Sequence, residues 1–241
     1  MIELSFGTAE LAAGDYHVTF ELQSPEGGRV SDVSTRLIIV EDLAIADLQG
    51  FQFVRTGQGQ GADTFVTAGS AEDFGGQPFL AVGHRNVNDQ PIVEHAYLRF
   101  DLRTRPDVGN DIDRVVLLLS MDADAWRAKS TLYAYGMPAE FAPNWIEQGD
   151  QHLTWESSPS VTEVQSLPLL GQVDVDNTNG SLEKQADKIR IFGTMLDEYV
   201  RRSQETVTIL LSRTTIGEKA TRFSSREGSA AHSPALAIRN K

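Results

Sequence analysis

The chain has 241 residues, no cysteine, and a formal net charge of −13 from 34 acidic and 21 basic side chains. Its apolar content of 40% suffices for a folded core, and its negative charge opposes binding to the phosphate backbone of nucleic acids. The absence of cysteine excludes disulfides, thiolate zinc sites and cysteine nucleophiles. The longest apolar run, Val115 to Leu119, is far shorter than the roughly 20 residues of a membrane-spanning helix, so we expect no membrane span.

The first forty residues are predicted to form a β-hairpin. Residues 17–22 alternate between polar and apolar side chains, as in a strand with one buried face. Residues 24–28 have the proline and glycine content of a turn, and residues 37–40 form an apolar run. A segment this short seldom buries enough surface to fold alone. We therefore expect residues 1–45 to be a partial immunoglobulin-like segment, either the remnant of a neighbouring domain or a hairpin packed on the main domain.

Residues 50–241 contain many short candidate strands separated by glycine-rich turns. Apolar and polar side chains alternate through residues 96–102 and 206–211, which places one face of each strand on a core. Residues 115–119 are continuously apolar, as in a strand that is covered on both faces. This pattern is typical of an all-β sandwich or barrel.

One short helix is predicted over residues 194–201. Thr194 and Asp197 have the spacing of a capping box, with Asp in place of the usual Glu. Leu196 and Val200 lie four residues apart and so share one helix face. We expect this helix to connect two strands.

Nothing in the sequence indicates an enzyme. The five histidines are scattered and no pair of them has zinc-ligand spacing. The chain has no Gly-x-Ser-x-Gly motif, although a Ser/His/Asp triad needs no fixed spacing. Carboxylate pairs such as Asp122 and Asp124 are interpreted as solvated turn residues.

From Asp63 onward, six segments in order resemble a DNRLRE-type domain, a jelly-roll β-sandwich related to carbohydrate-binding modules of bacterial polysaccharide-degrading proteins. They cover about three quarters of the chain. Phe74 departs from the family, which usually has Asn at that position. The matching segments are residues 63–66, 71–82, 96–102, 112–119, 144–159 and 223–236.

The resemblance implies a jelly-roll sandwich of two antiparallel sheets over residues 50–241. It also implies a non-catalytic module of a larger secreted or cell-surface protein, which it would attach to an extracellular polysaccharide beside neighbouring domains. The N-terminus has neither the basic start nor the apolar core of a signal peptide, so the chain is either cytoplasmic or part of a longer exported protein. The alternative function is a structural or adhesive spacer that binds no sugar.

Aromatic and basic side chains are the candidates for sugar binding, since sugar rings stack on aromatic rings and acidic sugars attract cations. Trp126 lies in a polar insertion beside Arg127 and Lys129, where it is either a ligand or a lid over the sandwich edge. Alternation predicts that Tyr133 and Tyr135 share a face of one strand, and that Tyr97 and Arg99 share a face of another strand; the pairing of these two strands is not readable from the sequence. Such tyrosines also occur in sandwich cores. The predicted binding residues, for a polysaccharide that is either neutral or acidic, are Tyr97, Arg99, Trp126, Arg127, Lys129, Tyr133 and Tyr135.

Jelly-roll sugar-binding modules often carry a structural calcium ion, which needs six to eight oxygen ligands. The candidate ligands are Asp63, Asp73, Asp174 and Asp176, which lie in or beside predicted turns. Arg226 and Glu227 are interpreted as a structural ion pair, with Arg99 and Asp101 as possible partners on a neighbouring strand.

Overall fold

A computed structural model describes residues 14–23, 29–39 and 48–241, apart from residues 89, 106–110, 123–128, 139–140, 142–144, 160, 183–187, 204, 215 and 218. The chain divides into two compact units, residues 1–48 and 49–241. Each unit is described by itself.

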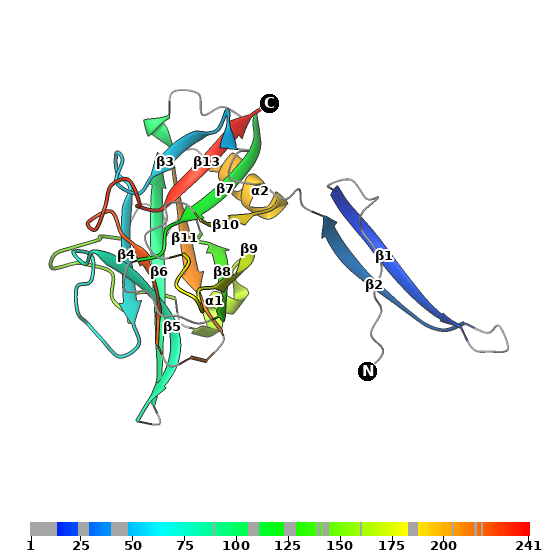
Figure 1. The fold of residues 1–241 in the computed structure, drawn as a ribbon, viewed down its shortest axis with the longest axis horizontal. Coiled ribbons are helices and arrows are strands. Elements are labelled where there is room, and N and C mark those ends of the chain that lie inside the picture. Colours follow the sequence, from blue (N-terminus) through cyan, green and yellow to red (C-terminus); the bar gives the residue numbers. More distant parts are fainter. Residues whose placement is uncertain are drawn as a thin grey trace. The chain divides into compact units, whose positions relative to one another are not determined.

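The first unit contains an antiparallel pair of strands, β1 (Gly14–Gln23) and β2 (Arg29–Ile39) (Figure 1). Gly14 pairs with Ile39 at one end, and the register shifts between Leu22 and Gln23 near the other end. The hairpin predicted from the alternating pattern is therefore confirmed. Its relation to an immunoglobulin-like domain stays a prediction.

The second unit is an all-β sandwich of two antiparallel sheets, which confirms the predicted fold class (Figure 1). The strands are β3 (Gln52–Arg55), β4 (Ala62–Thr67), β5 (Phe79–Val87), β6 (Gln90–Asp101), β7 (Ile112–Leu119), β8 (Lys129–Gly136), β9 (Leu169–Asp176), β10 (Ile189–Phe192), β11 (Thr206–Ser212), β12 (Thr221–Ser224) and β13 (Ala235–Asn240).

Four strands form one sheet in the order β10-β7-β13-β3. The others form a seven-stranded sheet, in which six strands follow the order β12-β5-β6-β11-β8-β9 and β4 also pairs with β6. Strand β6 is central, because β11 pairs along one edge while β4 and β5 share the other edge. This sharing brings the loop between β4 and β5 to the surface beside β12, where part of the candidate site lies.

The hydrophobic core lies between the two sheets. Leu98 and Phe100 of β6 face Leu117 of β7 and Leu236 of β13 in one cluster, and each of these side chains is 0% exposed. Full burial of an aliphatic or aromatic side chain stabilises a fold by about 1.5–3 kcal/mol. The alternating pattern of residues 96–102 therefore correctly predicted which side chains of β6 face the core.

The helix predicted at residues 194–201 is α2 (Thr194–Arg202), and Leu196 and Val200 are buried as expected. The predicted capping box is wrong. Residue Gly193 precedes the helix without a side-chain cap, and the Asp197 carboxylate accepts a hydrogen bond from the Val115 amide of β7 (2.6 Å). The Asp therefore ties the helix to the sheet rather than closing its own first turn.

Two further helical segments were not predicted: α1 (Val161–Ser166) and the 3₁₀ helix η2 (Leu102–Thr104). They span six and three residues, which is too short for an amphipathic period to appear in the sequence. Within the described part of the chain, no helix is long and apolar enough to cross a membrane.

Candidate functional site

The predicted binding residues Tyr97, Tyr133 and Tyr135 lie on one face of the seven-stranded sheet. Tyr97 of β6 and Tyr135 of β8 both pair with Leu210 of the intervening strand β11, so their side chains point to the same side. Tyr97 is nevertheless 0% exposed, because residues that follow β8 fold back over the sheet. The rings of Phe141 and Trp145 lie 5.9 and 6.4 Å from its ring, so Tyr97 is not accessible for the sugar stacking predicted from the sequence.

Arg99 contacts Trp145, which belongs to the same segment that covers the sheet. Its guanidinium lies 4.7 Å from the centre of the Trp145 ring and donates hydrogen bonds to the carbonyl oxygens of Gln60 (2.9 Å) and Trp145 (2.8 Å). Asp101 pairs instead with Arg103 (2.9 Å). The prediction that Arg99 or Asp101 pairs with Arg226 and Glu227 is therefore wrong.

Tyr133, Tyr135 and Lys129 remain at the surface of β8. The two half-buried tyrosine rings stack with their centres 6.4 Å apart, and Lys129 forms an exposed ion pair with Asp176 (2.8 Å). Lys129 lines a shallow groove of about 470 Å³ along β8 and β9. We call these residues the β8–β9 strip. Trp126 and Arg127 lie outside the described residues.

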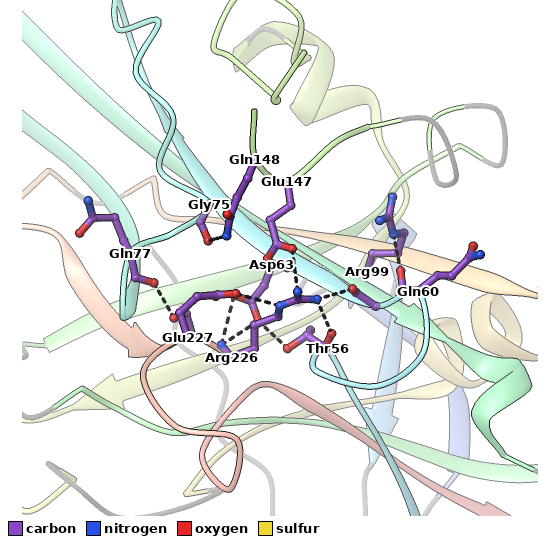
Figure 2. Close-up of polar contacts among 12 residues, drawn as sticks. Thr56, Gln60, Asp63, Gly75, Gln77, Arg99, Glu147, Gln148, Arg226 and Glu227 are labelled. Atoms are coloured by element: carbon purple, nitrogen blue, oxygen red, sulfur yellow. Dashed lines mark hydrogen bonds and ion pairs between the residues drawn. The ribbon is translucent and has the colours of Figure 1, made fainter. Parts of the chain in front are cut away.

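Four charged side chains, Asp63, Glu147, Arg226 and Glu227, meet beside the start of strand β4 (Figure 2). We call them the carboxylate–arginine cluster. Asp63 is 1% exposed and its Oδ2 accepts hydrogen bonds from the Thr56 hydroxyl (2.5 Å) and the Arg226 amide (3.2 Å). The Asp63 amide donates to Glu147 Oε1 (2.9 Å), which ties β4 to the turn after Trp145.

The Arg226 guanidinium forms ion pairs with two of the three carboxyl groups of the cluster. It lies 3.3 Å from Glu147 Oε2 and 2.9 Å from Glu227 Oε1, and it donates a hydrogen bond to the Gly61 carbonyl oxygen (2.6 Å). Burial raises the pKa of Asp63 from 3.8 to about 7 and that of Glu147 from 4.5 to about 7. Removal from water disfavours the charged form of a carboxyl group, and here it outweighs the hydrogen bonds that favour that form.

Within the described residues, one group of three acidic side chains lies close enough to hold a metal ion. Asp63, Glu147 and Glu227 each place one oxygen within 4.8 Å of the others. A calcium ion needs six to eight oxygens, whereas these carboxylates already accept hydrogen bonds from Arg226 and Thr56. This set of carboxylate oxygens suits the guanidinium of Arg226 better than it suits a calcium ion.

The other three calcium candidates do not join Asp63. Asp73 accepts hydrogen bonds from the Gly75 and Gly149 amides, and Asp174 accepts one from the Thr131 hydroxyl (2.7 Å). Asp176 pairs with Lys129, as described above. The structure therefore does not bring the four predicted ligands to one place, and calcium binding stays a prediction from the resemblance.

Sequence reasoning missed a groove of about 590 Å³ that is lined by strands β4, β5, β6 and β12 and by the loop after β4. We call it the aromatic–basic groove. Phe65 lies beneath it, with the Phe74 and Phe79 rings stacked against it at centre distances of 4.4 and 5.8 Å. The Arg222 guanidinium lies 4.0 Å from the centre of the Phe79 ring.

The groove is locally positive in an acidic chain. Arg85, Lys219 and Arg222 line it with three cations, against two carboxylates from Glu72 and Glu94. Arg85 pairs with Glu94 (3.1 Å). Among the described residues, neither Lys219 nor Arg222 forms an ion pair with a carboxylate.

Two local signals pointed toward this groove without identifying it. Phe74 stands where the resembled family usually has Asn, and Phe79 begins strand β5 within the same resembling segment. Arg222 reaches the groove because it pairs with Ala81 in the register of β12 and β5. That pairing joins segments about 140 residues apart and leaves no local pattern in the sequence.

A comparison with protein families finds a match to carbohydrate-binding module family 96 over residues 56–240. A comparison with curated proteins finds no match. The match covers nearly the whole second unit and agrees with the sugar-binding module expected from the resemblance, while the DNRLRE-type assignment itself stays a prediction. The family is one of binding modules rather than of enzymes. The chain therefore belongs to carbohydrate-binding module family 96.

Proposed function

We propose that this module binds a polysaccharide rich in acidic sugar units in the aromatic–basic groove. The observation that carries the proposal is the local excess of cations beside partly exposed Phe rings, in a chain whose net charge is −13. Because the net negative charge of the chain repels an acidic polymer, such a polymer can bind only where the surface is locally positive. The volume of the groove, about 590 Å³, is within the range of known ligand sites.

The groove offers the two kinds of contact that an acidic sugar needs. Phe74 is held flat against Phe65, so its ring is a fixed apolar surface for the C–H face of a sugar ring. Arg222 is oriented by its stacking on Phe79. A guanidinium held in one plane donates paired hydrogen bonds to a carboxylate or sulfate, and it loses little side-chain entropy on binding.

The module acts within a larger secreted or cell-surface protein, which it holds on an extracellular polysaccharide beside neighbouring domains. This part of the proposal is supported by the resemblance of six ordered segments to domains of exported bacterial proteins. The separate β1–β2 unit is compatible with a chain built of several modules.

The proposal is tested by affinity electrophoresis and calorimetry with polygalacturonate (carboxylated), dextran sulfate (sulfated) and dextran (neutral). We expect binding to at least one acidic polymer and none to dextran. Phe74→Ala and Arg222→Gln should each weaken binding about ten- to thirtyfold, which corresponds to roughly 1.4–2 kcal/mol for a lost ring or charged contact.

Matched controls come from the β8–β9 strip. Tyr133→Ala and Lys129→Ala remove one aromatic ring and one cation from the surface that the sequence predicted, and they should leave the affinity unchanged. If these variants lose binding while Phe74→Ala and Arg222→Gln do not, the strip is the site and the groove is not. If the parent chain binds none of the polymers, a spacer function replaces the proposal.

A further inference from the structure

The loop that carries Phe74 is held from one side by the turn at residues 147–152. The Gly149 amide donates a hydrogen bond to Asp73 Oδ2 (2.8 Å), and the Gln148 side-chain amide donates one to the Gly75 carbonyl oxygen (3.0 Å). Figure 2 shows Gln148 reaching toward Gly75 directly beside Glu147. Two consecutive residues of the turn, Gln148 and Gly149, therefore form hydrogen bonds with the loop residues on either side of Phe74.

The backbones of the loop and the turn are in direct contact at Gly75. A Cβ atom at this position would overlap the carbonyl oxygen of Glu147, so only glycine allows the approach. At the next position, Gly76, the nearest atom to an added Cβ would be Nε2 of Gln148 at 3.9 Å, which is ordinary contact. An alanine at Gly75 would therefore collide with the turn, whereas an alanine at Gly76 would fit, so the second substitution is a matched control for the first.

His152 adds a third connection. Its Nδ1 lies 2.7 Å from the Gly149 carbonyl oxygen and its Nε2 lies 3.1 Å from the Ala71 carbonyl oxygen. A carbonyl oxygen only accepts hydrogen bonds, so each ring nitrogen must donate to make both contacts. The turn consequently contacts the loop at Ala71, Asp73 and Gly75, which bracket Phe74 in the sequence.

We propose that the 147–152 turn is a positioning element for the aromatic–basic groove, which fixes the loop at residues 71–75 and through it the ring of Phe74. The inference rests on the proposed function, because it assigns these residues a role in sugar binding through Phe74. None of Gly75, Gln148 and His152 lies among the rings or cations of the groove, so each acts on a ligand through the position of the loop.

The test is a double-mutant cycle measured with polygalacturonate and dextran sulfate. Gly75→Ala should weaken binding severalfold, up to the loss caused by Phe74→Ala, and Gly76→Ala should change it less than twofold. In a Phe74→Ala background, Gly75→Ala should have no further effect, because the ring that it misplaces is gone. A merely structural role would give additive losses instead.

A second measurement needs no glycan. Hydrogen exchange of the Gly149 amide, which is bonded to Asp73, should become faster in Gly75→Ala and stay unchanged in Gly76→Ala. Gln148→Glu, which keeps the size of the side chain but removes the donor to Gly75, should weaken binding, and Gln148→Lys, which supplies a donor again, should restore part of it.

The outcomes separate the two proposals. If Phe74→Ala binds both polymers as the parent does, or the parent binds neither, the groove is not the site and both proposals fail. If Phe74→Ala loses affinity while Gly75→Ala and Gln148→Glu keep it, the function stands and the positioning role is refuted. Additive losses in the cycle, or unchanged exchange of the Gly149 amide in Gly75→Ala, refute the positioning role as well.

Discussion

The buried carboxyl group of Asp63 should make the second unit less stable as the pH rises. Its pKa is raised from 3.8 to about 7 by burial, so the folded protein keeps a proton that the unfolded chain releases at lower pH. Between these two pH values the folded state binds more protons, and the free energy of unfolding therefore falls as the pH rises. Above pH 7 both states are ionised at this position and the decline from this group ends.

The size of the effect follows from the two pKa values. A difference of one in pKa corresponds to 1.36 kcal/mol, and integration from pH 5 to pH 8 gives a loss of about 3 kcal/mol from Asp63. For a unit of this size the loss corresponds to roughly 6–12 °C in melting temperature. Glu147, whose pKa is raised to about 7 as well, adds to the slope in the same direction.

The perturbation is Asp63→Asn, which cannot ionise. One carboxamide oxygen can replace Oδ2, which accepts from Thr56 and Arg226, while Oδ1 makes only a 3.4 Å contact with the Arg226 amide. The variant should therefore fold, and its free energy of unfolding should fall by about 3 kcal/mol less than that of the parent between pH 5 and pH 8.

The assay is urea denaturation followed by tryptophan fluorescence at constant ionic strength, because all three Trp residues lie in the second unit. The control is Asp174→Asn, which neutralises an exposed carboxylate bonded to Thr131 and should keep the pH dependence of the parent. The reasoning fails if Asp63→Asn and the parent lose stability equally, or if the parent becomes more stable as the pH rises.

Three further predictions concern the architecture. Removing residues 1–45 should leave the melting temperature of the second unit unchanged in calorimetry, and loss of a cooperative transition would show that the first unit completes its core. Millimolar calcium, compared with EDTA, should not raise the melting temperature through the carboxylate–arginine cluster, because Arg226 already pairs with Glu147 and Glu227; a rise of several degrees would contradict this interpretation. Trp145→Ala should lower the free energy of unfolding in urea by about 3–5 kcal/mol, since the side chain is 5% exposed and packs on Tyr97; a change below about 1 kcal/mol would refute the packing argument.

The strands and their faces were readable from the sequence because they depend on neighbours close in the chain. Alternation through residues 96–102 placed Leu98 and Phe100 inward, and both are fully buried. The same alternation put Tyr97 on the opposite face, where it lies. The exposure of that face was not readable, because it depends on a segment nearly fifty residues later that folds over it and carries Trp145.

The candidate groove could not be predicted, although several of its residues drew attention individually. Phe74 was noted as a departure from the resembled family, while Arg222 was not noted at all. Their meeting depends on the register between β5 and β12, and that register is set by packing over the whole sheet. Sequence alone supplied the aromatic and basic side chains, whereas the distances between them are a property of the fold.

The carboxylate–arginine cluster separates what the sequence by itself determines from what only the tertiary structure determines. The motifs that contain Asp63, Glu147, Arg226 and Glu227 were each identified in the sequence, and their order carried the family resemblance that implied a jelly-roll sandwich. Composition and period act over a few residues, so they determined the class of fold and the identity of the charged groups. Burial and ion pairing act between segments about 80 residues apart or more, so only the tertiary structure decided that Asp63 is buried beside Glu147 and that Arg226 forms an ion pair with Glu147.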